Sequence, residues 1–298
     1  MITAENLTKR YQQHVAVDDV SFTCAPGTVT GFLGPNGAGK STTLRMLTGL
    51  TPPTSGRVRI DGRSYADLPN PGRLIGVMLD AAAQHPGRTG LETLKITTQL
   101  LDLPRSKAPE MLERVGLAAA GKRRVGDYSL GMRQRLGIAS ALIGDPAILV
   151  LDEPANGMDP EGIRWMRELL RDFASRGGTV LLSSHLLGEV QATVDRLVVI
   201  GSGRIVADGS LAELLTGGRT VVRGLDNVTL AGALRAAGHQ VRTEGGALTA
   251  DATSEQVGRI AASAGQVLLE LRDGGAGGLE DLFFSLTSSA AQPQGQAA

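Results

Sequence analysis

The chain contains a single cysteine, Cys24, and no apolar run long enough to cross a membrane. One cysteine excludes a disulfide within the chain and agrees with a reducing compartment. A membrane-spanning helix needs about 18 or more consecutive apolar residues, whereas runs such as residues 147–151 have the length of a strand. Residues 1–6 also lack the charged and then apolar pattern of a signal peptide. We therefore expect a cytoplasmic protein that reaches a membrane only through another chain.

The chain also lacks net charge, because 30 basic residues balance 30 acidic ones over 298 residues. A protein that binds nucleic acid usually carries a basic face, so no nucleic-acid partner is expected. Hydrophobic residues make up 42% of the chain and charged residues 20%, which is typical of a soluble globular protein. The length allows one large domain or two smaller ones.

The most informative stretch fits the pattern GxxxxGK[ST] at residues 34–41. It follows a β-favouring run and opens a helical pattern, which is the context that a phosphate-binding loop needs. Glycines permit backbone conformations that a Cβ forbids, so backbone N–H groups and the helix N-terminus can face a polyphosphate. We assign to nucleotide binding Gly34, Pro35, Asn36, Gly37, Ala38, Gly39, Lys40, Ser41 and Thr42.

Within this loop, Lys40 is expected to reach the β- and γ-phosphates, and the Ser41 hydroxyl is expected to hold Mg²⁺. The alternative is a glycine-rich turn that matches by accident. Residue frequencies give roughly one accidental match per hundred such chains, and the flanking strand and helix make an accident rarer still. The sequence therefore predicts a site for a nucleoside triphosphate.

Two acids follow a second apolar run. Residues 147–151 are continuously apolar, as in a strand buried on both faces, and Asp152 and Glu153 come next. In P-loop proteins an aspartate at the end of a neighbouring strand completes the Mg²⁺ site, which is the role expected of Asp152. Glu153 is placed to orient or deprotonate a water that attacks the γ-phosphate. The alternative is a pair of exposed acids at a strand end. The next predicted strand ends at His185, which would lie at the same edge of the sheet.

The other patterns place these residues in an α/β fold. Residues 1–33 alternate as β-structure, and further strands are expected at 57–62 and 73–79. Helical spacing over about 90–144 predicts helices that project from the sheet. A helix is expected from Pro160, and a hairpin with glycine at its turn over 197–206.

With these residues, the chain resembles the ATP-binding subunits of ABC transporters over about residues 1–217. Residues 129–132 match the signature usually written LSGGQ, and residues 157–160 match the D-loop. The resemblance implies a P-loop NTPase domain with an antiparallel β subdomain and a helical subdomain at about 88–144. It also implies that Glu153 is catalytic together with His185 and Lys40, and that Asp159 contributes to the nucleotide site. Spacing alone favours a half-exposed strand aromatic at Tyr11, but the resemblance implies an adenine-stacking ring.

The signature predicts that two copies of the chain act together. Ser129, Gly131 and Met132 would lie near a helix start and form a second anion site, facing away from the chain's own P-loop. Each ATP would then be closed in by the signature of a second chain. We expect a homodimer in which bound ATP holds the two subunits together. Hydrolysis of the ATP then lets the subunits separate.

Three departures from the family pattern stand out. Asp80 occupies the position of the usual glutamine and is a third candidate Mg²⁺ ligand, whereas Gln84 comes four residues too late. Leu130 and Met132 replace a glycine and a glutamine of the signature. These variations are similar to those of the bacterial bacitracin- and daunorubicin-resistance exporters. That resemblance implies a separate membrane permease, which holds this chain at the inner face of the cell membrane, and export of a hydrophobic compound. The alternative is a soluble ABC-type ATPase that acts on the ribosome or DNA.

The pattern changes after about residue 217. Residues 218–287 show the order β-α-β-β-α-β, which suggests a small ferredoxin-like α+β domain with Ser254 capping its second helix. Residues 279–286 predict a final amphipathic helix, and the small polar residues 288–298 predict a disordered tail. This domain is expected to serve regulation or dimerisation, or else to be a stabilising appendage without chemistry.

Overall fold

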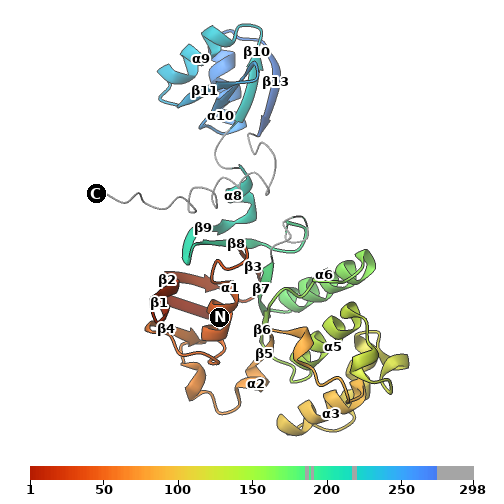
Figure 1. Cartoon of the computed structure of the whole chain (residues 1–298). Coiled ribbons are helices and arrows are strands. Elements are labelled where there is room, and N and C mark those ends of the chain that lie inside the picture. Colours follow the sequence, from red (N-terminus) through yellow and green to blue (C-terminus); the bar gives the residue numbers. More distant parts are fainter. Residues whose placement is uncertain (185–187, 189–190, 217–219, 274–298) are drawn as a thin grey trace. The chain divides into compact units, whose positions relative to one another are not determined.

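The computed structural model describes residues 1–184, 188, 191–216 and 220–273 (Figure 1). The chain forms two compact units, one over residues 1–208 and one that begins at Gly209. The predicted boundary at 217, the helix at 279–286 and the tail at 288–298 fall in or beside the undescribed part and stay predictions. None of the described helices is long and apolar enough to span a membrane.

A six-stranded sheet forms the centre of the first unit. Its strands lie in the order β5-β6-β7-β3-β8-β9, and the first four neighbouring pairs are parallel. Strands β3 and β6 are buried at every residue, as their continuous apolar runs predict. The strands are β3 (Val29–Leu33), β5 (Ile75–Met78), β6 (Ile148–Leu151), β7 (Thr179–Ser184), β8 (Arg196–Gly201) and β9 (Arg204–Ser210). The predicted hairpin is β8–β9, and its turn residues Ser202 and Gly203 both have positive φ, 47° and 82°.

A separate antiparallel sheet has the order β2-β1-β4. It consists of β1 (Ile2–Tyr11), β2 (His14–Cys24) and β4 (Ser55–Ile60), and it confirms the predicted antiparallel β subdomain. Its buried side chains join one core with those of β3 and of the helix α1 (Lys40–Leu47), including Leu7, Phe32 and Leu44. The rings of Phe22 and Phe32 stack within that core with centroids 5.2 Å apart.

Two strand predictions were displaced. The expected strand at 73–79 begins only at Ile75, because Pro71 opens a short helix, α2 (Pro71–Leu74); proline at a first helical position has its φ already set for a helix. The expected strand at 57–62 is β4, which ends at Ile60 because Asp61 and Gly62 turn with positive φ.

The predicted helices between the strands are confirmed. The segment after β5 contains α3 (Gly90–Leu100), α4 (Lys107–Arg114) and α5 (Leu130–Leu142), and α6 (Pro160–Ser175) lies between β6 and β7 (Figure 1). Helix α3 starts with a capping box, in which the Thr89 and Glu92 side chains accept from each other's backbone N–H. The hydrogen bonds from Thr89 lower the pKa of the Glu92 carboxyl.

The second unit has the predicted element order after a short helix, α8 (Leu211–Thr216). Its sheet has the order β11-β12-β10-β13, and each neighbouring pair is antiparallel. The elements are β10 (Thr220–Gly224), α9 (Asn227–Ala236), β11 (Val241–Glu244), β12 (Ala247–Ala250), α10 (Ser254–Ser263) and β13 (Leu268–Asp273). Leu230 and Leu234 of α9 are both fully buried, as their spacing predicts. Thr253 caps α10 instead of Ser254, because Thr253 forms a capping box with Gln256. The ferredoxin-like classification stays a prediction.

Cys24 supplies a probe of the fold. Its side chain is fully buried, and burial raises its pKa from 9.0 to about 12. The thiolate is the reactive form, so a rise of three units lowers its fraction about a thousandfold at pH 8. We expect native protein to resist iodoacetamide at pH 8 and denatured protein to react fully, as measured by intact mass. Equal labelling rates in the two states would place Cys24 on the surface.

Candidate active site

The phosphate-binding loop connects the end of β3 to the start of α1. Gly37 and Gly39 have φ of 80° and 107°, a region that L side chains rarely adopt. A Cβ at Gly39 would also come within 2.6 Å of the Ala16 carbonyl oxygen of β2. Gly39 is the N-cap of α1 and has no side chain to occupy the N–H groups of the first turn. The start of α1 can therefore bind an anion.

An open cavity of about 800 Å³ lies over this loop. It brings together loop residues, the end of β1, the start of β2 and, from the pair that follows β6, Glu153 but not Asp152. The lining residues are Tyr11, His14, Ala16, Asn36, Gly37, Gly39, Lys40, Ser41, Thr42 and Glu153. The other predicted loop residues do not line the cavity. Ala38 is 4% exposed and packs into the core. The backbone carbonyls of Gly34 and Pro35 accept hydrogen bonds from Lys40.

Hydrogen bonds to the loop hold the Lys40 side chain in the wall of this cavity. Its side chain is only 7% exposed, and its Nζ donates to the Gly34 and Pro35 oxygens at 2.7 and 3.3 Å. The same Nζ lies 3.7 Å from Glu153 Oε1. A buried ammonium needs such partners, and a phosphate entering the cavity offers it a stronger one.

The two predicted acids lie at the carboxyl end of β6, beside β7. Ser183 of β7 contacts both, since its hydroxyl donates to Asp152 Oδ1 and accepts from the Glu153 backbone N–H at 3.0 Å. Glu153 lines the cavity. His185 follows β7 directly, but it lies outside the described residues, so its predicted role stays a prediction.

One side of the cavity, where a nucleotide base is expected to bind, is formed by the β-hairpin of β1 and β2. Tyr11 ends β1, is 46% exposed, and pairs with His14 at the start of β2. Lys9 Nζ lies 5.2 Å from the centre of the Tyr11 ring. The Lys9 ammonium lies over one face of the ring, and the exposed remainder of the ring can stack on a nucleotide base. The sequence analysis missed His14 and Ala16 as lining residues; their only signal was their position just after Tyr11 in an expected hairpin.

The signature residues do not line this cavity. Ser129 is the N-cap of α5, and its Oγ accepts from the Met132 N–H at 3.2 Å. Leu130, which replaces the usual glycine, packs against Gly157 of the D-loop, since a Cβ at Gly157 would collide with it. Ser129, Gly131 and Met132 are therefore not part of the cavity over their own chain's P-loop, and their role in a second anion site stays a prediction.

Asp159 and Asp80 also lie outside the lining. Asp159 caps α6 through a 2.8 Å hydrogen bond from Gly162 N–H, which gives it a structural role already. Asp80 is exposed, two residues beyond β5. Gln84 donates to the Arg133 oxygen at 3.2 Å, so its amide turns towards α5. Within the described part of the chain, no three His, Cys, Asp or Glu side chains gather into a metal-binding group.

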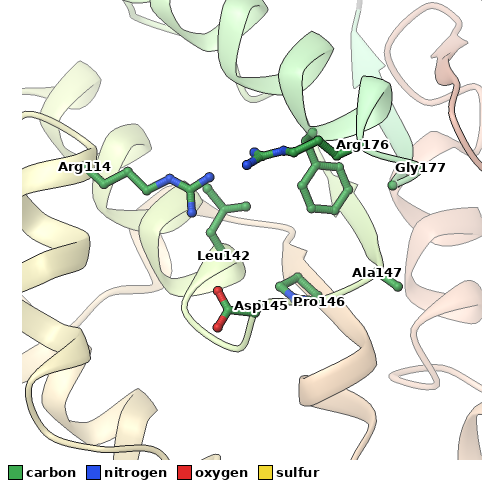
Figure 2. A pocket seen from close by; sticks show the side chains of 9 residues that line it. Arg114, Leu142, Asp145, Pro146, Ala147, Arg176 and Gly177 are labelled. Atoms are coloured by element: carbon green, nitrogen blue, oxygen red, sulfur yellow. The ribbon is translucent and has the colours of Figure 1, made fainter.

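A second hollow of about 650 Å³ opens at the amino ends of strands β6 and β7, opposite the end at which Asp152 and Glu153 lie (Figure 2). Arg114 and Arg176 point into it from opposite walls, with Asp145 between them. Helices α4, α5 and α6 all end here, and helix C-termini carry partial negative charge. The basic side chains complement those ends, and Arg176 also pairs with Asp172. The backbone N–H groups of the loops that border this hollow, at Asp145, Ala147, Arg176, Gly177 and Gly178, already donate to carbonyl oxygens, which distinguishes it from the first cavity.

Residues 17–156 match the model of a protein family described as "ABC transporter". The chain is 39% identical over 210 residues to the lantibiotic transport ATP-binding protein of Streptococcus pyogenes, which covers 70% of this chain and 90% of that one. It is 41% identical to a bacitracin transport ATP-binding protein of Bacillus licheniformis, over 70% and 69% of the two chains. A daunorubicin resistance ATP-binding protein of Streptomyces coeruleorubidus is 39% identical, over 72% and 69%.

Solved structures show the same architecture. An ATP-binding subunit of an ABC transporter matches with a TM-score of 0.66 and 27% identity, over 72% of this chain and 91% of that one. A dimeric ATP-binding cassette in a post-hydrolysis state, bound to ADP and Pi, matches with a TM-score of 0.65 and 25% identity, over 70% and 98%. The fold of this part of the chain thus agrees with that of ATP-binding cassettes, one of which is bound to the products of hydrolysis.

Proposed function

Since this chain belongs to the ATP-binding proteins of ABC transporters, we propose that it is the ATP-hydrolysing subunit that powers an exporter through a separate membrane permease. The observation that carries the proposal is the likeness, at 39–41% identity, to lantibiotic transport, bacitracin transport and daunorubicin resistance ATP-binding proteins. The exported compound is accordingly an antibiotic, a drug or another hydrophobic molecule. The chain works at the cytoplasmic face of the membrane, where its permease holds it.

ATP binds in the cavity over the P-loop. The adenine stacks on Tyr11, and the phosphates lie along the backbone of residues 36–42 at the start of α1. When ATP binds, Lys40 gives up its contacts with the Gly34 oxygen and with Glu153 and donates to phosphate oxygens instead. Its positive charge offsets the negative charge of the phosphates. The free energy of binding comes mainly from these charge-assisted hydrogen bonds.

Oxygen atoms at the site suit Mg²⁺. Ser41 lines the cavity, and Asp152 follows β6 directly; hydroxyl and carboxylate oxygens are the ligands that Mg²⁺ prefers. Asp80 is the third candidate, since it follows β5, whose Met78 oxygen accepts from Asp152 N–H at 2.7 Å. Held by these oxygens, Mg²⁺ would supply positive charge that offsets the negative charge of the phosphates.

Hydrolysis depends on the carboxylate of Glu153. Its Oε1 is paired with Lys40 at 3.7 Å. Once Lys40 turns to the phosphates, the carboxylate is released to orient a water against the γ-phosphate and to take its proton. His185, next after β7, is proposed to contact the γ-phosphate from the same edge of the sheet.

Two chains act as a homodimer. The signature residues Ser129, Gly131 and Met132 do not line the cavity of their own chain. At the start of α5, where Ser129 Oγ accepts from the Met132 N–H in the single chain, they bind the γ-phosphate held by a second chain. Asp159 approaches the second nucleotide from the D-loop. The dimeric cassettes among the similar structures support this arrangement.

The proposal is tested by purifying the tagged chain from native membranes in mild detergent and identifying its partner by mass spectrometry. We expect an integral membrane protein, in roughly equal amount, that raises ATP turnover when its transported compound is added. Recovery with ribosomes or DNA instead of a membrane protein would contradict the exporter proposal and favour a soluble ABC-type ATPase.

A further inference from the structure

Glu153 has a strained backbone. Its φ is 48°, in the left-handed region, where the Cβ of an L residue lies too close to the following carbonyl oxygen. Such a conformation persists only where the surrounding structure enforces it. The residues that hold this backbone therefore also determine where the Glu153 carboxylate points.

Two side chains hold it from opposite sides. The Ser183 hydroxyl accepts from the Glu153 N–H at 3.0 Å. On the carbonyl side, Gln134 Nε2 donates to the Asn156 oxygen at 3.1 Å and to the Glu153 oxygen at a longer 3.4 Å. A backbone bond from Asn156 N–H to the Glu153 oxygen, 3.1 Å, closes the turn between them. Gln134 thus bridges both ends of the turn that follows the catalytic residue.

A glutamine is costly at this position. Gln134 is only 4% exposed, and its Oε1 has no hydrogen-bond partner among the described residues. The amide nitrogen must face the turn, because both facing atoms are carbonyl oxygens. A buried acceptor without a partner destabilises the folded state, so an apolar side chain of the same shape would serve stability as well or better. The polar contact with the turn is what the glutamine provides.

Gln134 also belongs to α5, five residues after Ser129. A second contact joins the same helix to the same loop, since Leu130 packs against Gly157. We propose that Gln134 is a positioning residue that couples the signature helix to the backbone of Glu153. The proposal rests on the proposed function, in which Ser129 binds the nucleotide of the partner chain and Glu153 acts on the nucleotide of its own chain. Helix α5 then connects the two ATP sites of the dimer.

The test compares Gln134→Met, which keeps the shape and removes the donor, with wild type. We expect kcat for ATP to fall about tenfold, as for the loss of one buried hydrogen bond, with ATP affinity unchanged. The Hill coefficient for ATP should fall towards 1, because the sites lose their connection. Gln99→Met, at an exposed position of α3, is the matched control and should behave as wild type.

Gln134→Glu separates hydrogen bonding from packing. An ionised carboxylate repels both carbonyls, whereas a protonated one donates to them as the amide does. The kcat of this variant, relative to wild type, should therefore rise as the pH falls, and the methionine variant should show no such rescue. A packing role would lower thermal stability and ATP affinity in both variants without rescue, and that result would overturn the proposal.

The outcomes also separate this proposal from the proposed function. If wild type hydrolyses ATP cooperatively and Gln134→Met matches it in kcat and Hill coefficient, the coupling role is wrong and the ATPase assignment stands. If wild type neither dimerises with ATP nor hydrolyses it, the proposed function fails first, and no Gln134 variant can restore it.

Discussion

Replacing Glu153 with glutamine is expected to abolish most ATP hydrolysis while leaving ATP binding intact. Glutamine keeps the size of the side chain and its contact with the cavity, but it cannot take a proton from the attacking water. Positioned bases contribute about 10²- to 10⁴-fold to such reactions, so phosphate release should fall by at least about a hundredfold. The backbone contacts of Glu153 with Ser183 and Gln134 are unaffected by the change.

The measurement is phosphate release at saturating ATP, together with nucleotide affinity from equilibrium dialysis. Glu161→Gln is a suitable control, because Glu161 is an exposed acid in the first turn of α6. It should retain wild-type turnover. If Glu153→Gln hydrolyses ATP at the wild-type rate, the base lies elsewhere and the role given to Glu153 is wrong.

Replacing Lys40 with alanine is expected to weaken both ATP binding and catalysis. The ammonium makes two hydrogen bonds to the loop and an ion pair with Glu153, all of which become available to phosphate. Hydrogen bonds to charged groups contribute about 1.5–3 kcal/mol each, so ATP affinity should fall about ten- to hundredfold. The loss in turnover should be larger, because charge grows on the phosphate oxygens as the bond breaks.

The control for Lys40→Ala is Lys95→Ala on the exposed surface of α3, which should leave affinity and turnover unchanged. Circular dichroism and thermal melting of both variants establish that they fold. Unchanged ATP affinity in folded Lys40→Ala would mean that the phosphates do not lie in the cavity over the P-loop.

The parts of the site that sequence alone predicted are the local ones. The P-loop was predictable because its geometry depends on glycines within eight residues, 34–41, and Gly37 and Gly39 do adopt positive φ. Asp152 and Glu153 were predictable because a continuous apolar run marks a buried parallel strand, and such strands end at one edge. In both cases one short segment contains the whole physical reason.

The missed residues depend on tertiary pairing. His14 and Ala16 line the cavity only because β2 folds back on β1 beside the loop. Gln134 lies in helix α5, and its side chain donates to the Glu153 carbonyl oxygen 19 positions further along the chain. Nothing in the local pattern around these residues announces those contacts.

Local competition explains the smaller errors. Residues 73 and 74 have β-favouring neighbours, but Pro71 starts a helix that includes them. At α10, Ser254 and the preceding Thr253 are both good caps. Thr253 is the N-cap because Gln256, three residues later, completes a capping box with it. In each case a neighbour two or three residues away outweighs the residue's own preference.

The central claim is that two chains close over two nucleotides, each supplying the signature for the other's ATP. The most direct test is the mass of Glu153→Gln in solution with Mg²⁺ and ATP, from light scattering, together with the nucleotide content of the particle. We predict a particle of about 62 kDa, twice the 31.0 kDa chain, that holds two ATP and dissociates when ATP is replaced by ADP. A particle that stays at the mass of one chain at saturating ATP would contradict the account.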